Sequence, residues 1–140
     1  MEGLDQPKRV TVEEYLVNEA RAEYKSEYHN GILIPVHRTV NERGEIVTLD
    51  GAQPAHNLLV AKIMALMGLC PDDTDSPVYA SGQLVYLRAC ERLLYPDTSV
   101  VYQKPEYLIS KYGLDALLNP SVIIEVLSEG TEAYDRGEKF

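Results

Sequence analysis

One apolar run near the end of the chain, residues 121–128, limits most strongly what this chain can fold into. Its sequence, Ser-Val-Ile-Ile-Glu-Val-Leu-Ser, contains four β-branched residues, which favour a strand over a helix. Asn119-Pro120 directly before the run ends the preceding segment. Because apolar side chains occupy both sides of the pleat, we expect a strand that is buried on both faces and central in its sheet.

Glu125 is the one charged residue inside this run. Burial of a charged carboxylate costs free energy unless a partner or a metal ion compensates the charge. Glu125 is therefore the first candidate for chemistry in the chain. The alternative is a Glu125 side chain that lies at an edge of the sheet and reaches water.

Composition sets the class of the protein. The chain has 140 residues, of which 45% are hydrophobic, and this predicts one globular domain with its own core. A formal net charge of -9 argues against nucleic-acid binding through a global basic field, although a local basic groove remains compatible with it. Cys70 and Cys90 are isolated and form neither a metal-binding pair nor a disulfide framework, so a reducing, cytoplasmic location fits best.

No segment of the sequence predicts insertion into a membrane. The longest apolar stretch, residues 58–70, is interrupted by Lys62 and is too short to span a bilayer. The first five residues, Met-Glu-Gly-Leu-Asp, lack the basic and apolar regions of a signal peptide. We therefore expect no membrane contact.

Residue spacing predicts three helices. Thr11 and Glu14 have the spacing of a capping box, which predicts a helix over residues 12–23. A second helix is expected to begin at residues 53–57 and, because apolar side chains lie on most of its sides, to be well buried against the sheet. A third helix is expected over residues 131–140, with Thr131 as its N-cap.

Strands are expected between these helices. Asn30-Gly31 is a tight-turn pair that predicts a hairpin, and another short strand is expected over residues 45–49. Residues 107–118 fit either a short helix or an ordered loop. The other strand candidates are residues 78–80, 83–88, 92–95 and 98–102. Helices at intervals around a largely continuous mixed sheet make this an α/β or α+β domain.

Asp97 and Glu125 are single acids on two predicted neighbouring strands. Two carboxylates that converge near the edge of a sheet can hold a hard divalent cation such as Mg²⁺. Such an ion binds a phosphate oxygen and lowers the pKa of a bound water, and a nearby cation offsets charge on a pentacovalent phosphorus transition state. The alternative for Asp97 is an ordinary strand opening, since Pro-Asp pairs also occur in that role.

Five segments carry a resemblance to a known family. They are Glu27-Tyr28 with Asn30-Gly31, residues 51–57, Tyr95-Pro96-Asp97, residues 124–128 and residues 131–140. In this order they resemble the Uma-type putative restriction endonucleases of the PD-(D/E)-x-K nuclease superfamily. The Pro-Asp pair alone is a weak signal, whereas the ordered set is specific. The resemblance extends from about Val10 to Phe140.

The resemblance implies a sheet flanked by helices, with a restriction-endonuclease-like core and a metal-dependent endonuclease activity on DNA. It implies that Asp97 and Glu125 bind Mg²⁺, which Mn²⁺ can replace, and that the carbonyl of Val126 is a further ligand. Glu27 matches the early acid of the family and would add a carboxylate to the site. An exposed glutamate on a hairpin is the alternative for Glu27.

Two departures from the family pattern affect the expected activity. Leu127 stands where the superfamily has its lysine, and the resemblance implies that the following helix supplies this group, which makes Lys139 the candidate. Such domains normally continue with more strands, so residues 1–140 are expected to form a single nuclease-like domain that lacks the C-terminal part of the family fold.

Two functions therefore compete. The intact set of Asp97, Glu125 and Lys139 favours a DNA endonuclease. The acidic balance and the shortened fold favour a catalytically silent module that acts in binding or dimerisation, for example as a homodimer. His56 either contacts substrate or satisfies the start of its helix, and we favour the structural role. Gln83 either borders the site or faces solvent.

Overall fold

The computed structural model describes residues 8–36, 38–48, 54–68 and 76–126. The helices are α1 (Val12–Arg21), α2 (Pro54–Gly68) and a short 3-10 helix, η1 (Arg88–Cys90). The strands are β1 (Ser26–His29), β2 (Ile32–Pro35), β3 (Arg38–Val40), β4 (Ile46–Thr48), β5 (Val78–Ala80), β6 (Val85–Leu87), β7 (Arg92–Leu94), β8 (Thr98–Val100), β9 (Tyr107–Leu108), β10 (Ala116–Leu117) and β11 (Val122–Ile124).

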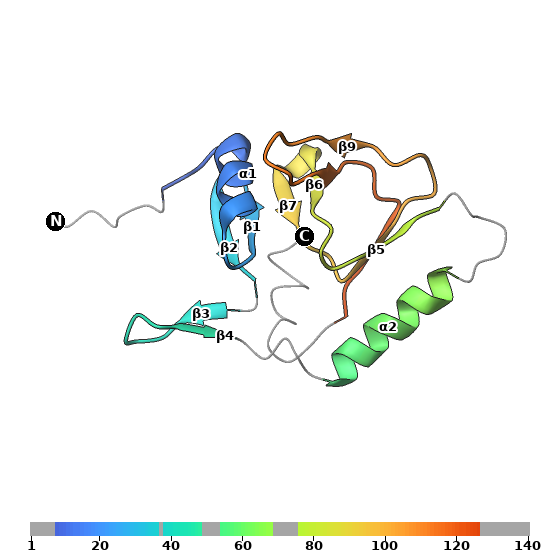
Figure 1. Cartoon of the computed structure of the whole chain (residues 1–140), viewed down its shortest axis with the longest axis horizontal. Helices are drawn as coiled ribbons and strands as arrows, with labels where there is room; N and C mark the ends of the chain where they lie inside the picture. The colour runs from blue at the N-terminus through green and yellow to red at the C-terminus, as the bar shows by residue number, and fades with distance from the viewer. Residues whose placement is uncertain (1–7, 37, 49–53, 69–75, 127–140) are drawn as a thin grey trace.

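Two sheets carry most of the described fold. The larger has six strands in the order β2-β1-β7-β6-β10-β9, with β10 and β6 parallel and the other pairs antiparallel. The smaller has three antiparallel strands in the order β11-β8-β5, and β3 and β4 form a separate hairpin. In Figure 1, α1 lies against β1 and β2, whereas α2 lies on the other side of the molecule near β5. The predicted mixed α+β class is confirmed.

Local sequence signals set the first helix and the first hairpin. The N–H of Glu14 donates to Thr11 Oγ1 at 3.1 Å and the N–H of Thr11 donates to Glu14 Oε2 at 2.8 Å, which is the predicted capping box. Asn30 and Gly31 have φ angles of 46° and 94°, as a tight turn with two left-handed residues requires, and they join β1 to β2.

The main core lies between α1 and the six-stranded sheet. Its fully enclosed members include Tyr15 from α1, Tyr28 from β1 and Leu93 from β7. The rings of Tyr15 and Tyr28 are 5.5 Å apart, and the Tyr15 hydroxyl donates to the carbonyl of Ser26 at 2.6 Å. Tyrosine is stable in this core because its hydroxyl group has a partner while its ring is removed from water.

Two predictions about burial are wrong for the part of the chain that the structure describes. β11 is an edge strand there, paired only with β8, and its three residues are half-buried. α2 contains no buried residue, and Leu58, Leu59 and Leu66 are 62%, 48% and 69% exposed. An apolar sequence shows that a segment can be buried, but it does not show how many strands or helices pack against that segment.

Residues 107–118 form neither a helix nor a plain loop. They contain β9 and β10, which pair with each other in antiparallel fashion at one edge of the six-stranded sheet. α2 has 15 residues, and no helix in the described ranges is long and apolar enough to cross a membrane.

The buried tyrosines predict a loss of stability in alkaline solution. Burial, together with nearby acidic groups, raises the pKa of Tyr15 and of Tyr95 above the ordinary value of 10.0. The folded state then holds these protons more tightly than the unfolded state, so the stabilisation is complete below about pH 10 and is lost as the pH rises towards the raised values. We expect the urea midpoint to begin to fall as the pH rises past about 10.

Tyr→Phe variants test this assignment. Tyr95→Phe is expected to be less stable than the parent at neutral pH but to lose less stability on going to alkaline pH. Tyr102→Phe, which alters a side chain that is 55% exposed, is the matched control and should reproduce the parent's pH dependence. An identical pH dependence in all three proteins would show that Tyr95 is not responsible.

Candidate functional site

Asp97 and Glu125 lie at the same end of the β8–β11 ladder. The register pairs Val122 with Val100, and the ladder ends at the pair of Ile124 with Thr98. Asp97 and Glu125 each lie one residue beyond this pair, outside the ladder. The two candidate acids are therefore brought to the same end of the three-stranded sheet.

A hydrogen bond holds the two acid-bearing segments together. The backbone N–H of Val126 donates to Asp97 Oδ2 at 2.8 Å. Val126 is 7% exposed, Glu125 is half-buried, and the Oε1 atom of Glu125 is enclosed away from water. A role for the Val126 carbonyl as a metal ligand stays a prediction.

Asp97 lies where the chain passes from one sheet to the other. β7 belongs to the six-stranded sheet and β8 to the three-stranded sheet, and Tyr95-Pro96-Asp97 is the whole connection between them. Pro96 is fully buried and contributes no backbone N–H, so it sits in this connection rather than in a ladder. The Asp97 carboxylate is thus carried by a short, enclosed segment rather than by a surface loop.

His56, near the start of α2, contacts the same carboxylate. Its Nε2 atom is 3.4 Å from Asp97 Oδ1, and the two side chains are 12% and 14% exposed. The contact is an ion pair only when the imidazole is protonated. The Nδ1 atom of His56 is buried and has no hydrogen-bond partner in the described part of the chain.

The contact between His56 and Asp97 was not predicted from the sequence, which favoured a structural role for His56 at its helix terminus. The available signal was the position of His56 inside the segment 51–57, one of the five that carry the family resemblance. The structure places this histidine beside the candidate acid.

Glu27 is buried rather than exposed, which excludes the reading of it as a surface glutamate on a hairpin. Its side chain lies in β1, the residue is 2% exposed, and its Oε2 atom accepts the backbone N–H of Tyr95 at 2.6 Å. The Glu27 side chain therefore contacts the backbone of the connection that carries Asp97.

Other sequence-predicted residues are placed as follows. The side-chain amide of Gln83 donates to the carbonyls of Leu84 and Asp115, at 2.9 Å and 3.0 Å, so Gln83 ties two backbone segments together. Leu127, Lys139 and the helix expected over residues 131–140 lie outside the described residues, and Lys139 stays a prediction.

The donor set fits a hard divalent cation. Among the residues that the structure describes, no three His, Cys, Asp or Glu side chains converge on a common point. Mg²⁺ does not need three, because it keeps several waters and is commonly held by one or two carboxylates together with substrate phosphate. Two acids at one end of a ladder are enough for such a site.

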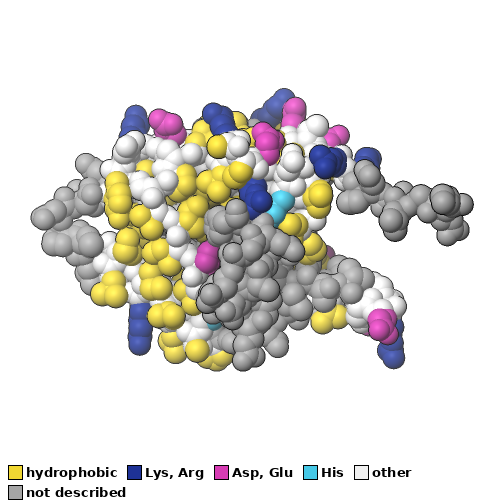
Figure 2. Space-filling model, turned by 180° about the vertical axis from the view of Figure 1, so that it is seen from behind, with side chains coloured by type: hydrophobic (Ala, Val, Ile, Leu, Met, Phe, Trp, Pro, Cys, Tyr) yellow, Lys and Arg dark blue, Asp and Glu magenta, His cyan; other side chains and the backbone are white. Residues whose placement is uncertain are grey.

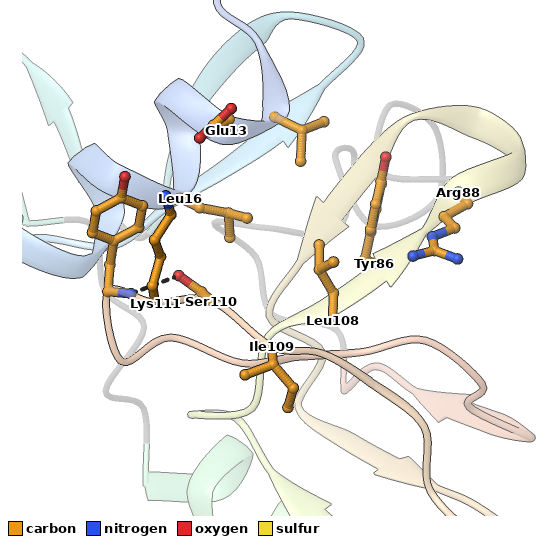
Figure 3. A pocket seen from close by; sticks show the side chains of 10 residues that line it. Glu13, Leu16, Tyr86, Arg88, Leu108, Ile109, Ser110 and Lys111 are labelled. Carbon is orange, nitrogen blue, oxygen red and sulfur yellow. Dashed lines mark hydrogen bonds between the residues drawn. The ribbon is translucent and has the colours of Figure 1, made fainter.

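A separate hollow of about 440 Å³ lies between α1, β6 and the segment after β9. Figure 3 shows Tyr86 and Arg88 on one side of it and Leu16 and Lys111 on the other. The guanidinium of Arg88 lies 5.8 Å from the centre of the Tyr86 ring. The hollow does not include any of the candidate acids, so it is a different region from the Asp97 site.

Charge on the described surface is dispersed. On the face shown in Figure 2, the Lys and Arg side chains are scattered, with one near the middle of the face, whereas hydrophobic side chains are grouped on the left of the view. The exposed leucines Leu58, Leu59 and Leu66 of α2 contribute to the apolar surface of the molecule. A broad basic field is thus absent from the described part of this face.

Comparison with known proteins gives a family match and two relatives. The family model described as Uma2, putative restriction endonuclease, matches residues 42–140. Uncharacterized protein sll1609 of Synechocystis sp. (strain ATCC 27184 / PCC 6803 / Kazusa) is 30% identical over 133 residues, covering 95% of this chain and 67% of the relative. Uncharacterized protein slr1290 of the same organism is 26% identical over 132 residues, covering 94% of this chain and 60% of the relative. No solved structure matches the chain.

Proposed function

The chain belongs to the Uma2 family of putative restriction endonucleases, and from this premise we propose that it is a metal-dependent endonuclease that hydrolyses DNA phosphodiester bonds. The observation that best supports the proposal is the hydrogen bond from the Val126 N–H to Asp97 Oδ2, which ties the two acid-bearing segments to each other. The chain spans 67% and 60% of the lengths of the two relatives, so an activity of the whole protein is a proposal.

Asp97 and Glu125, with the carbonyl of Val126, are the residues that would hold Mg²⁺, and Mn²⁺ is expected to replace it. When bound, such an ion coordinates a phosphate oxygen and lowers the pKa of a bound water. The two carboxylates would hold the cation at the end of the ladder, and the hydrogen bond from the Val126 N–H would keep the Asp97 carboxylate in place for it. Lys139 is the proposed cation beside the attacked phosphate.

DNA is the proposed partner, bound through a local groove. The whole chain carries a formal net charge of -9, so the contacts with phosphates have to come from a limited set of cations. Binding that depends on a few phosphate contacts weakens as salt is raised, and cleavage is therefore best assayed at low ionic strength.

A second function has one observation in its favour. The exposed leucines of α2 give this chain an apolar surface of the kind that mediates association between copies. A catalytically silent nuclease fold of residues 1–140 that acts in binding or as a homodimer is the alternative. This alternative predicts no cleavage of plasmid DNA with either Mg²⁺ or Mn²⁺ at any protein concentration.

Lys139→Met separates a catalytic lysine from a solvated one. We expect plasmid cleavage to fall about 100-fold while Mn²⁺ affinity, measured by calorimetry, is unchanged, because the lysine acts on the phosphate and does not bind the metal. Lys104→Met removes the same charge from an exposed position and is the matched control, expected to cleave like the parent. Unchanged cleavage by Lys139→Met would remove Lys139 from the site.

A further inference from the structure

We infer that Glu27 is a positioning residue that fixes Asp97 through the backbone of Tyr95, and that it is not a ligand of the metal. The consequence for metal affinity rests on the proposed function. The chain of hydrogen bonds from Glu27 through Tyr95 and Asp97 to Val126, called the relay below, does not depend on the proposed function. The relay and the metal affinity can therefore be tested separately.

The first element of the relay is a buried carboxylate on a rigid platform. β1 lies inside the six-stranded sheet between β2 and β7, with Tyr28 paired to Leu93 and His29 to Arg92. Glu27 is 2% exposed and its Oε2 atom is 2.6 Å from the backbone nitrogen of Tyr95, directly after β7. A hydrogen bond from a buried N–H to a carboxylate is short and strong, and its loss leaves a buried donor without a partner.

The second element is a stiff dipeptide. Pro96 has a fixed φ angle, and a residue that precedes proline is restricted to extended conformations. Tyr95 is further held by its hydroxyl, which donates to Glu19 Oε1 at 2.9 Å. Because the torsions between the Tyr95 nitrogen and Asp97 are so restricted, fixing that nitrogen fixes the backbone from which the Asp97 side chain extends.

The third element connects this backbone to the other acid-bearing strand. Asp97 Oδ2 accepts the N–H of Val126 at 2.8 Å, next to Glu125. The relay thus runs from Glu27 in the six-stranded sheet, through the Tyr95-Pro96-Asp97 connection, to the end of β11 in the three-stranded sheet. Glu27 and Asp97 each accept a backbone N–H, but they differ in position: Glu27 is 2% exposed inside the six-stranded sheet, whereas the Asp97 side chain is 14% exposed at the end of the β8–β11 ladder. Glu27 therefore fits a residue that orients a ligand better than it fits a ligand that faces the ion and the entering phosphate.

Paired substitutions distinguish the positioning residue from a ligand. Glu27→Gln keeps a side-chain oxygen for the Tyr95 N–H, whereas Glu27→Ala removes it. We expect Glu27→Gln to bind Mn²⁺ like the parent and Glu27→Ala to bind it about 10- to 100-fold more weakly, as is typical when a group that orients a ligand is lost. A comparable loss of Mn²⁺ affinity in both variants would overturn the inference, because a metal ligand is weakened by either change.

Amide hydrogen exchange in the metal-free protein tests the relay directly. The N–H groups of Tyr95 and Val126 are expected to be protected in the parent and in Glu27→Gln, and to exchange faster in Glu27→Ala. Glu14→Ala removes the capping-box side chain at the start of α1 and controls for a general loss of stability. In this control, the amides of Tyr95 and Val126 should stay as protected as the neighbouring core amides. Unchanged Val126 protection in Glu27→Ala would contradict the relay.

The outcomes remain separable in every case. If the parent binds no Mn²⁺, the proposed function fails while the exchange of Val126 still decides the relay. If Glu27→Ala does not fold, Glu27→Gln decides alone: retained Mn²⁺ affinity with a protected Tyr95 amide supports positioning, and lost affinity with the same protected amide refutes it.

Discussion

Asp97→Asn is expected to lower DNA cleavage by a factor of about 1,000 or more and to weaken Mn²⁺ binding strongly. A metal ion stabilises the charge of a transition state by several kcal/mol, and each 1.4 kcal/mol corresponds to about tenfold in rate. Asparagine retains an oxygen that can accept the Val126 N–H, so the hydrogen bond to Asp97 that ties β8 to β11 has a replacement. The loss is therefore one of charge at the site and not of fold.

Asp115→Asn is the matched control for this experiment. Asp115 is exposed, and its Oδ1 atom accepts the N–H of Ser110 in a loop, at 3.1 Å. The same change of an acid to an amide there should leave plasmid cleavage and Mn²⁺ affinity unaltered. Cleavage by Asp97→Asn at the rate of Asp115→Asn would mean that Asp97 does not hold the metal.

Leu93→Ala is expected to lower the free energy of unfolding by about 3 kcal/mol. Leu93 is fully buried in β7, in register with Tyr28 of β1 and Tyr86 of β6, so its truncation leaves a cavity in the main core. The urea midpoint should fall while the dependence of the free energy on urea is unchanged. β7 also leads directly into Tyr95-Pro96-Asp97, so a weakened β7 is expected to loosen the candidate site.

Leu33→Ala supplies the comparison for the core substitution. Leu33 lies on β2 and is 42% exposed, so its truncation should cost no more than about 0.5 kcal/mol, as for most surface changes. Equal costs for Leu33→Ala and Leu93→Ala would show that the six-stranded sheet does not form the main core.

Short-range chemistry in the sequence was enough to predict much of the fold. The Thr11–Glu14 capping box and the Asn30-Gly31 turn act over a few residues, and both occur where they were predicted. One arrangement of distant segments was also predicted correctly, the neighbouring position of the strands observed as β8 and β11. The capping box and the turn depend only on residues close in the sequence, which is why their signals can be recognised there.

What was not predicted depends on contacts between distant segments. Glu27 reaches the backbone of Tyr95, 68 residues later, and His56 reaches Asp97 from another element. Neither partner is encoded in the spacing of nearby residues. The edge position of β11 in the described chain has the same origin, since an apolar run does not reveal how many strands flank it.

Crystals soaked in Mn²⁺ would show whether a metal ion binds at the end of the β8–β11 ladder. Manganese scatters anomalously, so its position can be found without reference to the surrounding protein density. We expect one anomalous peak between the carboxylates of Asp97 and Glu125, with metal–oxygen distances of about 2.0–2.6 Å. If crystals soaked at a saturating Mn²⁺ concentration show no peak there, or show a peak only at other acids, the proposed metal site is wrong.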